Sequence, residues 1–156
     1  MTGFDLEHDT IAPRTFDEAL REINTFLGHK SPYKLLAAIA IPNINKAEQT
    51  TAHTQTIANE AQIACALERY RLAHGEYPEA LDALVPQFIQ KLPHDIIGGP
   101  PSQGSGATSQ PLHYQRTADG KFLLYSVGWN ETDDGGQDTS AASPHDYAQG
   151  DWVWKN

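Results

Sequence analysis

The feature that most constrains this chain is a stretch of helical periodicity between Lys46 and Pro78. Its apolar residues recur three or four positions apart and predict one helix face turned toward a core, made of Ile57, Ala61, Ala64, Leu67, Tyr70 and Ala73. Polar residues predict an opposite face in solvent, made of Asn59, Glu60, Gln62, Glu68, Arg69 and Arg71. Gly75 and Pro78 mark its end. A helix of about 25 residues is roughly 37 Å long, so later segments must pack along it.

The N-terminal region contains a signal for a second, shorter helix. Met1–Arg14 has no periodicity and is expected to be an extended or disordered arm. Thr15 and Glu18 have the spacing of a capping box, which predicts an amphipathic helix from there to Leu27. Gly28 is expected to close this helix.

A helix start signal at Ser31-Pro32 leads into the apolar run Leu35–Ile41. Pro42 removes one backbone hydrogen bond and crowds the preceding turn, so we expect a kink there before the helix continues. A helix that is apolar nearly all round is seldom left in water. We therefore expect the 35–46 helix to be buried, either against the Thr15–Leu27 helix or against another copy of the chain.

Beyond the long helix, the pattern changes toward strands. Glu79–Leu84 predicts a short helix, and then a period of two appears in Leu112–Arg116 and Lys121–Val127. Ala118–Gly120 between these segments is a hairpin turn signal. Trp152–Trp154 alternates in the same way and predicts a third strand. Three strands with one face on a helix are stable, whereas an isolated hairpin is not.

The expected fold class is therefore α+β. A long N-terminal helix, kinked near Pro42, packs against a short helix and a three-stranded antiparallel sheet. Residues 1–34 form the arm and the short amphipathic helix, and residues 35–156 form one domain. Within it, residues 100–111 consist of Gly, Ser, Pro, Gln, Thr and Ala with little to bury, which predicts a flexible loop.

Composition excludes some classes of function. The net charge of −9 argues against nucleic-acid binding, because no basic stripe is present to contact a phosphate backbone. Met1–Asp17 is acidic and lacks the apolar stretch of a signal peptide, and Leu35–Ile41 is too short to span a membrane. The single Cys65 cannot form an internal disulfide and is expected to pack as a small hydrophobic residue.

Three groups of motifs resemble one protein family. They are Leu35–Asn43 with its Pro-Asn, then Ala66–Arg71 followed by Gly75–Pro78 and Leu81–Leu84, and last Leu124–Gly128 followed by an acidic loop and Gly150–Trp152. In this order and spacing they resemble the type II secretion major pseudopilin and, more broadly, type IV pilins. The chain departs from that family at Gly28–Lys34, where two lysines and a proline replace the prepilin cleavage site and the apolar half-helix.

The resemblance implies a pseudopilin-like domain over 35–156 and a structural role rather than catalysis. The implied setting is the bacterial cell envelope, facing the periplasm, in a secretion apparatus. The implied partners are other protein subunits, with self-association through the 35–46 helix as one form. It also implies a Ca²⁺ site in the acidic loop, since carboxylates and carbonyls supply the oxygen ligands this cation takes. The candidate ligands are Asp133 or Asp134, Asp138, Asp146 and Asp151, the last replacing an Asn. The alternative is a solvated acidic loop.

A competing class is a metal-dependent hydrolase that uses the acidic loop with His145 as a base beside Asp146. His94-Asp95 has the same composition, but both pairs are more typical of surface turns. No Gly-x-Ser-x-Gly, P-loop or dinucleotide-binding glycine pattern is present. The C-terminal aromatics Trp129, Trp152 and Trp154 are expected to pack against the helix, and exposed ones would instead form a stacking patch.

Overall fold

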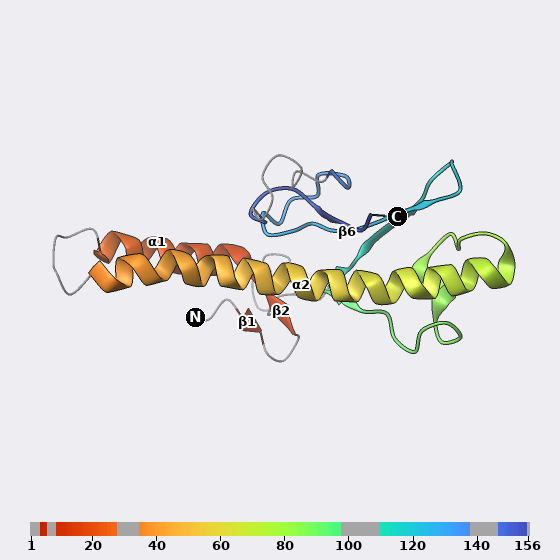
Figure 1. Cartoon of the computed structure of the whole chain (residues 1–156), viewed down its shortest axis with the longest axis horizontal. Helices are drawn as coiled ribbons and strands as arrows, with labels where there is room; N and C mark the ends of the chain where they lie inside the picture. The colour runs from red at the N-terminus through yellow and green to blue at the C-terminus, as the bar shows by residue number, and fades with distance from the viewer. Residues whose placement is uncertain (1–3, 6–8, 28–34, 98–109, 138–146, 156) are drawn as a thin grey trace.

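The computed structural model describes residues 4–5, 9–27, 35–97, 110–137 and 147–155. These residues form an α+β fold in which the other elements are arranged along one long helix (Figure 1). The elements in chain order are β1 (Phe4–Asp5), β2 (Thr10–Ile11), α1 (Pro13–Leu27), α2 (Leu35–His74), the 3₁₀ helix η2 (Leu81–Leu84), β3 (His94–Asp95), β4 (Gln110–Pro111), β5 (His113–Arg116), β6 (Phe122–Ser126) and β7 (Trp152–Val153).

Helix α2 joins the two predicted helical stretches into one helix of 40 residues. At 1.5 Å per residue it is about 60 Å long. It continues through Pro42 without interruption, so the proline does not end the helix, and Figure 1 shows α2 as one continuous helix. It ends as expected at Gly75, which has a φ of +86° and donates its amide to the Arg71 carbonyl at 2.7 Å.

Helix α1 lies along the N-terminal half of α2, in the antiparallel direction (Figure 1). It begins at Pro13, two residues before the capping box at Thr15, because proline suits the first turn of a helix. Helix α1 thus folds back onto α2, as in the first of the two alternatives given for covering the 35–46 helix. The side chains of residues 35–43 lie outside the described part of the chain, so the burial predicted for the apolar run is untested.

The three-stranded sheet has the predicted strands and the order β5-β6-β7, antiparallel throughout. Its hairpin turn is closed by the Thr117 amide, which donates to the Lys121 carbonyl at 3.0 Å. Strand β7 pairs only with the end of β6, where Trp152 lies opposite Ser126. The sheet packs over the distal half of α2 (Figure 1).

Two further pairs of short strands were not predicted. Strands β3 and β4 pair antiparallel, so residues 110–111 of the predicted flexible loop form a strand, while 100–109 lie outside the described residues. Strands β1 and β2 pair within the segment expected to be an extended or disordered arm. The described part of this segment is extended and packed on the rest of the fold, since Thr10 and Ile11 are buried and the Ile11 amide donates to the Ile96 carbonyl at 2.7 Å.

The core consists of two groups of buried side chains. The distal cluster lies between α2, η2 and the sheet and contains Ile63, Ala64, Ala66, Leu67, Tyr77, Leu84, Leu112, Phe122 and Leu124. The proximal cluster lies nearer the middle of α2 and contains Ile11, Ala52, Ile96, Ile97, Trp129 and Trp152. Trp129 and Trp152 are therefore core residues, and the expectation that these aromatics pack on the helix is confirmed.

The buried face of α2 is rotated from the predicted one. Asn59 and Glu60, predicted to face solvent, are buried, whereas Ile57, predicted to face the core, is 41% exposed. Cys65 is also exposed rather than packed. The buried residues between 52 and 67 include Ala, Thr, Asn and Glu, and such small or polar residues separate the two faces of a helix poorly by hydrophobicity alone.

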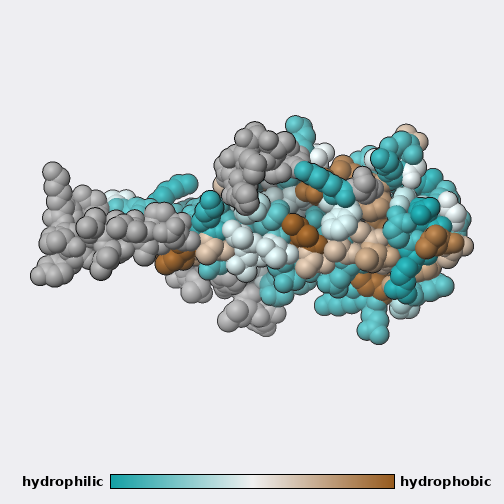
Figure 2. Space-filling view, in the orientation of Figure 1, coloured by the Kyte–Doolittle hydropathy of each residue, from teal (hydrophilic) through white to brown (hydrophobic). Residues whose placement is uncertain are grey.

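Hydrophobic side chains on the visible surface form separated groups among polar ones (Figure 2). The large exposed ones are spread over α1, α2 and the segment after η2, and they are Ile23, Ile44, Ile57, Leu72 and Val85. No helix in the described residues is both long and apolar enough to cross a membrane.

Candidate functional site

The acidic segment predicted to bind metal connects β6 to β7, and we call residues 127–151 the closing loop. Its two ends are held together by the sheet, since Ser126 and Trp152 face each other across the strand pair. Of this loop, residues 127–137 and 147–151 are described. The closing loop therefore starts and returns at one edge of the sheet.

Glycines allow the two arms of the loop to approach closely. Gly128 has a φ of +68°, and a Cβ atom built there would lie 2.4 Å from the Gly150 carbonyl oxygen. Gly136 has a φ of +79°, and its Cβ would lie 2.7 Å from a Leu123 methyl group. The positive φ favours glycine at both positions. At Gly128 the backbone oxygen also leaves no space for a Cβ, whereas at Gly136 the Leu123 side chain would have to move.

Asp151 ties the two arms together from the inside. Its side chain is buried, and its two carboxylate oxygens accept the amides of Asp134 at 3.2 Å and Gly136 at 2.6 Å. Its own amide donates to the Gln137 carbonyl at 3.2 Å. Burial raises the pKa of Asp151 above its usual range, the two amides oppose this, and the negative charges of Asp134 and Asp133 add to it.

Asp133 lies on the outer side of the same turn. Its Oδ1 accepts the Gly135 amide at 2.9 Å and the Tyr125 hydroxyl at 3.0 Å, and His113 Nδ1 lies 3.7 Å from Oδ2. The Gly135 amide, followed by the Tyr125 hydroxyl, lowers the pKa of Asp133. This carboxylate is therefore ionised and well hydrogen-bonded at neutral pH.

Asp134 is the remaining predicted ligand in the described part of the closing loop. Its Oδ2 accepts the side-chain amide of Asn130 at 3.2 Å. Its charge raises the pKa of Asp151, so the two carboxyl groups are near enough to repel each other. A cation placed between them would relieve that repulsion.

Of the predicted ligands, Asp133, Asp134 and Asp151 lie in the described part of the closing loop, where both carboxylate oxygens of Asp151 are already bonded to backbone amides. Asp138 and Asp146, the other two predicted ligands, and His145, the predicted hydrolytic base, lie outside the described residues. Within the described residues, no group of three or more His, Cys, Asp or Glu side chains is arranged to hold a metal ion. The Ca²⁺ site stays a prediction, in which Asp133 and Asp134 would need oxygens from the rest of the loop.

Glu131 anchors the closing loop to the N-terminal helix, a contact not predicted from the sequence. It lies in the same turn with a φ of +53°, and its side chain is almost fully buried. Its carboxylate accepts the Arg14 backbone amide at 3.0 Å and pairs with the Arg14 guanidinium at 3.0 Å. A negative side chain at the amino end of α1 is favourable, because free backbone amides and the helix dipole are positive there.

A second acidic site, also missed by sequence reasoning, lies beneath the sheet. Glu60 on α2 and Asp95 on β3 are both buried. Asp95 accepts hydrogen bonds from the Ser126 hydroxyl and from the amides of Ile97 and Val127, whereas no described residue donates to Glu60 Oε1. Burial and, second, the charge of Asp95 raise the pKa of Glu60 to about 8.

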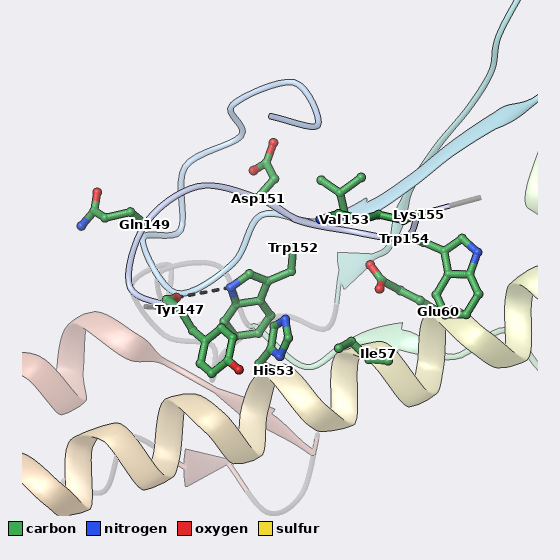
Figure 3. A pocket seen from close by; sticks show the side chains of 10 residues that line it. All are labelled: His53, Ile57, Glu60, Tyr147, Gln149, Asp151, Trp152, Val153, Trp154 and Lys155. Carbon is green, nitrogen blue, oxygen red and sulfur yellow. Dashed lines mark hydrogen bonds between the residues drawn. The ribbon is translucent and has the colours of Figure 1, made fainter. Parts of the chain in front are cut away.

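Glu60 lies at the inner wall of a groove between α2 and the segment that carries β7 (Figure 3). In the sequence, only the spacing of Glu60 from Thr56 and Ile63, by four and three residues, indicates that it lies on the same helix face as these two buried residues. Periodicity of apolar residues alone does not reveal such a position.

The chain was compared with protein-family models, with curated proteins and with solved structures. No family model, no curated protein and no solved structure matches it.

Proposed function

We propose that this chain is a non-enzymatic, pseudopilin-like structural module of the bacterial cell envelope or secretion apparatus that binds other protein subunits. The supporting observation is the way the closing loop packs back on the sheet. A long helix carries a three-stranded antiparallel sheet on its distal half, and a loop tied by Asp151 leads into the last strand. This is the arrangement that the resemblance of Leu124–Gly128 and Gly150–Trp152 to the end of major pseudopilins implies.

The proposed contact with other subunits is the amino-terminal part of α2, residues 35–46. This part extends away from the sheet, with α1 beside it (Figure 1). Its sequence carries five large or branched apolar residues in the run from Leu35 to Ile44. A helix with apolar residues on several sides offers a face to a partner beyond the one α1 covers.

Light scattering over a range of concentrations tests this contact by self-association. We expect a mass above that of the monomer which Ile39→Glu reduces to the monomer, because a buried charge at an interface is costly. Leu72→Glu changes a residue that is 77% exposed at the other end of α2 and should have no effect. A monomer at every concentration contradicts self-association through residues 35–46.

The calcium part of the proposal is tested by thermal unfolding. A cation that binds only the folded state adds stability of about 2.7 kcal/mol at a hundredfold excess over its Kd. We expect chelator to lower the Tm and millimolar Ca²⁺ to restore it, with Mg²⁺ less effective because it tolerates irregular loops poorly. Asp138→Ala should abolish the response.

Asp119→Ala is the matched control, because Asp119 lies in the β5–β6 turn, where it accepts from Thr117 and Lys121 rather than from the closing loop. This variant should keep the full Ca²⁺ response. A Tm that responds to neither chelator nor Ca²⁺, in protein first freed of metal, would leave the closing loop as an acidic surface without a bound ion.

A further inference from the structure

The groove beside Glu60 has the size of a small ligand site, with a volume of about 340 Å³. One wall is α2 with Ile57, and the other is the C-terminal segment with Val153 and Trp154 (Figure 3). At one end His53 and Tyr147 stack with their ring centroids 4.0 Å apart, and Trp152 meets His53 edge-on. The walls therefore combine aliphatic and aromatic side chains with polar and charged ones.

Glu60 supplies an acidic group to this groove. Its residue is only 1% exposed, and no described residue donates a hydrogen bond to its Oε1. Figure 3 shows the carboxylate reaching from α2 toward the β7 segment across the groove. Leaving a buried acceptor without a donor costs free energy, so the site favours an occupant that brings a donor.

The other charged groups around Glu60 also select the charge of the occupant. Asp151 lines the groove with both oxygens already bonded to backbone amides, and Lys155 lines it from an exposed position. Behind Glu60, the buried Asp95 on β3 adds negative charge. The negative charges of Asp95 and Asp151 would repel an anion, whereas a cation that donates a hydrogen bond would be attracted and would favour the ionised form of Glu60.

We propose that this groove binds the ammonium group of a lysine side chain from a partner polypeptide, with Glu60 as its counter-ion. The aliphatic stem of the lysine lies along Ile57 and Val153, and the ammonium group meets the Trp154 ring and Glu60. A compact ammonium suits a single unpartnered oxygen better than the planar fork of arginine does. This inference rests on the proposed role as a subunit-binding module and gives the chemistry of one partner contact.

Binding has a proton balance that can be measured. Because burial raises the pKa of Glu60 to about 8, most of the protein carries a proton on this carboxyl at pH 7. The incoming ammonium stabilises the carboxylate, so Glu60 releases its proton to the buffer as the ion pair forms. The apparent affinity should then rise about tenfold for each pH unit up to pH 8.

The test uses the full chain and two blocked tripeptides, glycine-lysine-glycine and glycine-norleucine-glycine. Norleucine keeps the aliphatic stem and removes the charge. Titration calorimetry at pH 7 in two buffers of different ionisation enthalpy should show at least tenfold tighter binding of the lysine peptide and release of close to one proton. Equal binding of both peptides, or no proton release, would overturn the proposal.

Glu60→Gln should lower the affinity for the lysine peptide at least tenfold. It should also abolish the proton release and the rise in affinity with pH. Glu22→Gln removes an exposed acid on α1 and should bind like the original chain. If Glu60→Gln fails to fold by circular dichroism, the two peptides on the unaltered chain still decide the matter.

Free pentylamine distinguishes the source of the ammonium group. Because pentylamine carries the same stem and ammonium group, it should bind about as tightly as the lysine peptide. If it binds at least tenfold more tightly, the groove disfavours the peptide backbone and is a site for small free amines, which would overturn the polypeptide partner. Absence of lysine binding alongside a normal Ca²⁺ response and self-association would refute this inference alone.

Discussion

Two carboxyl groups share the interior between α2 and the strands, and their hydrogen bonding differs. Asp95 accepts a hydroxyl and two amides, whereas Glu60 Oε1 has no donor in the described part of the chain. Burial raises the pKa of both groups, but only Asp95 has hydrogen bonds that favour its charged form. Of the two groups, Asp95 therefore has the surroundings that favour the charged form, and its charge helps to keep the proton on Glu60.

Glu60 should make stability decrease as pH rises. Its pKa is about 8 in the folded protein against an ordinary value of 4.5, so between these values the folded state holds a proton that the unfolded chain has lost. The contribution is fully present below pH 4.5 and is lost as pH rises through 8. The glutamine of Glu60→Gln does not titrate. Between pH 5 and 9 the free energy of unfolding of this variant should therefore fall by roughly 2–4 kcal/mol less than that of the unsubstituted protein.

Urea unfolding at several pH values measures this difference. Above pH 5 the carboxyl groups with a lowered pKa are already ionised, so their titration does not contribute to the measured change in stability. They are Glu68, Asp119 and Asp133. Glu22→Gln serves as the control and should keep the original slope. Parallel pH profiles for Glu60→Gln and the original chain would show that Glu60 is charged in the folded protein.

At the scale of elements, the sequence predicted the helices and the main sheet because their periodicity extends over many residues. It did not predict β1 to β4, which are two residues long and lie in segments without an alternating pattern, whereas the equally short β7 lies in the alternating Trp152–Trp154. Nor did it predict the ion pair of Glu131 with Arg14, which lie 117 positions apart. The candidate Ca²⁺ ligands of the closing loop, Asp151 among them, followed from the family resemblance, whereas the hydrogen bonds of Asp151 to the opposite arm of the loop are visible only in the tertiary structure.

The closing loop depends on the space that Gly128 leaves for the opposite arm. Gly128→Ala should destabilise the protein by at least about 2 kcal/mol, from backbone strain together with contact against the Gly150 carbonyl. Gly120→Ala isolates the strain, because Gly120 has a similar φ of +78° but nothing within 4 Å of a Cβ, and should cost about 1 kcal/mol. Chemical denaturation measures the loss of unfolding free energy in both variants. Equal losses would contradict the prediction and mean that the two arms of the closing loop separate easily.

At the scale of the whole molecule, the distal and proximal clusters share two elements. Helix α2 contributes Leu67 to the first cluster and Ala52 to the second. Strand β6 contributes Leu124 to the distal cluster, and the chain directly after it contributes Trp129 to the proximal one. Because neither cluster can lose these elements without exposing the other, we expect the described part of the fold to unfold as one unit.

Leu84→Ala tests this cooperativity from one end. Leu84 is fully buried in the distal cluster, so its truncation should cost about 2–5 kcal/mol. Trp129 and Trp152 lie in the proximal cluster, whereas Trp154 packs on the distal one. Trp154 is therefore replaced by Phe both in the parent protein and in the Leu84→Ala variant, so that tryptophan fluorescence comes from the proximal cluster alone. The fluorescence and far-ultraviolet circular dichroism transitions should move together to lower denaturant and stay coincident. A fluorescence midpoint left unchanged while the dichroism signal shifts would mean that the proximal cluster, with Ile11 and the closing loop, folds independently of the distal end of α2.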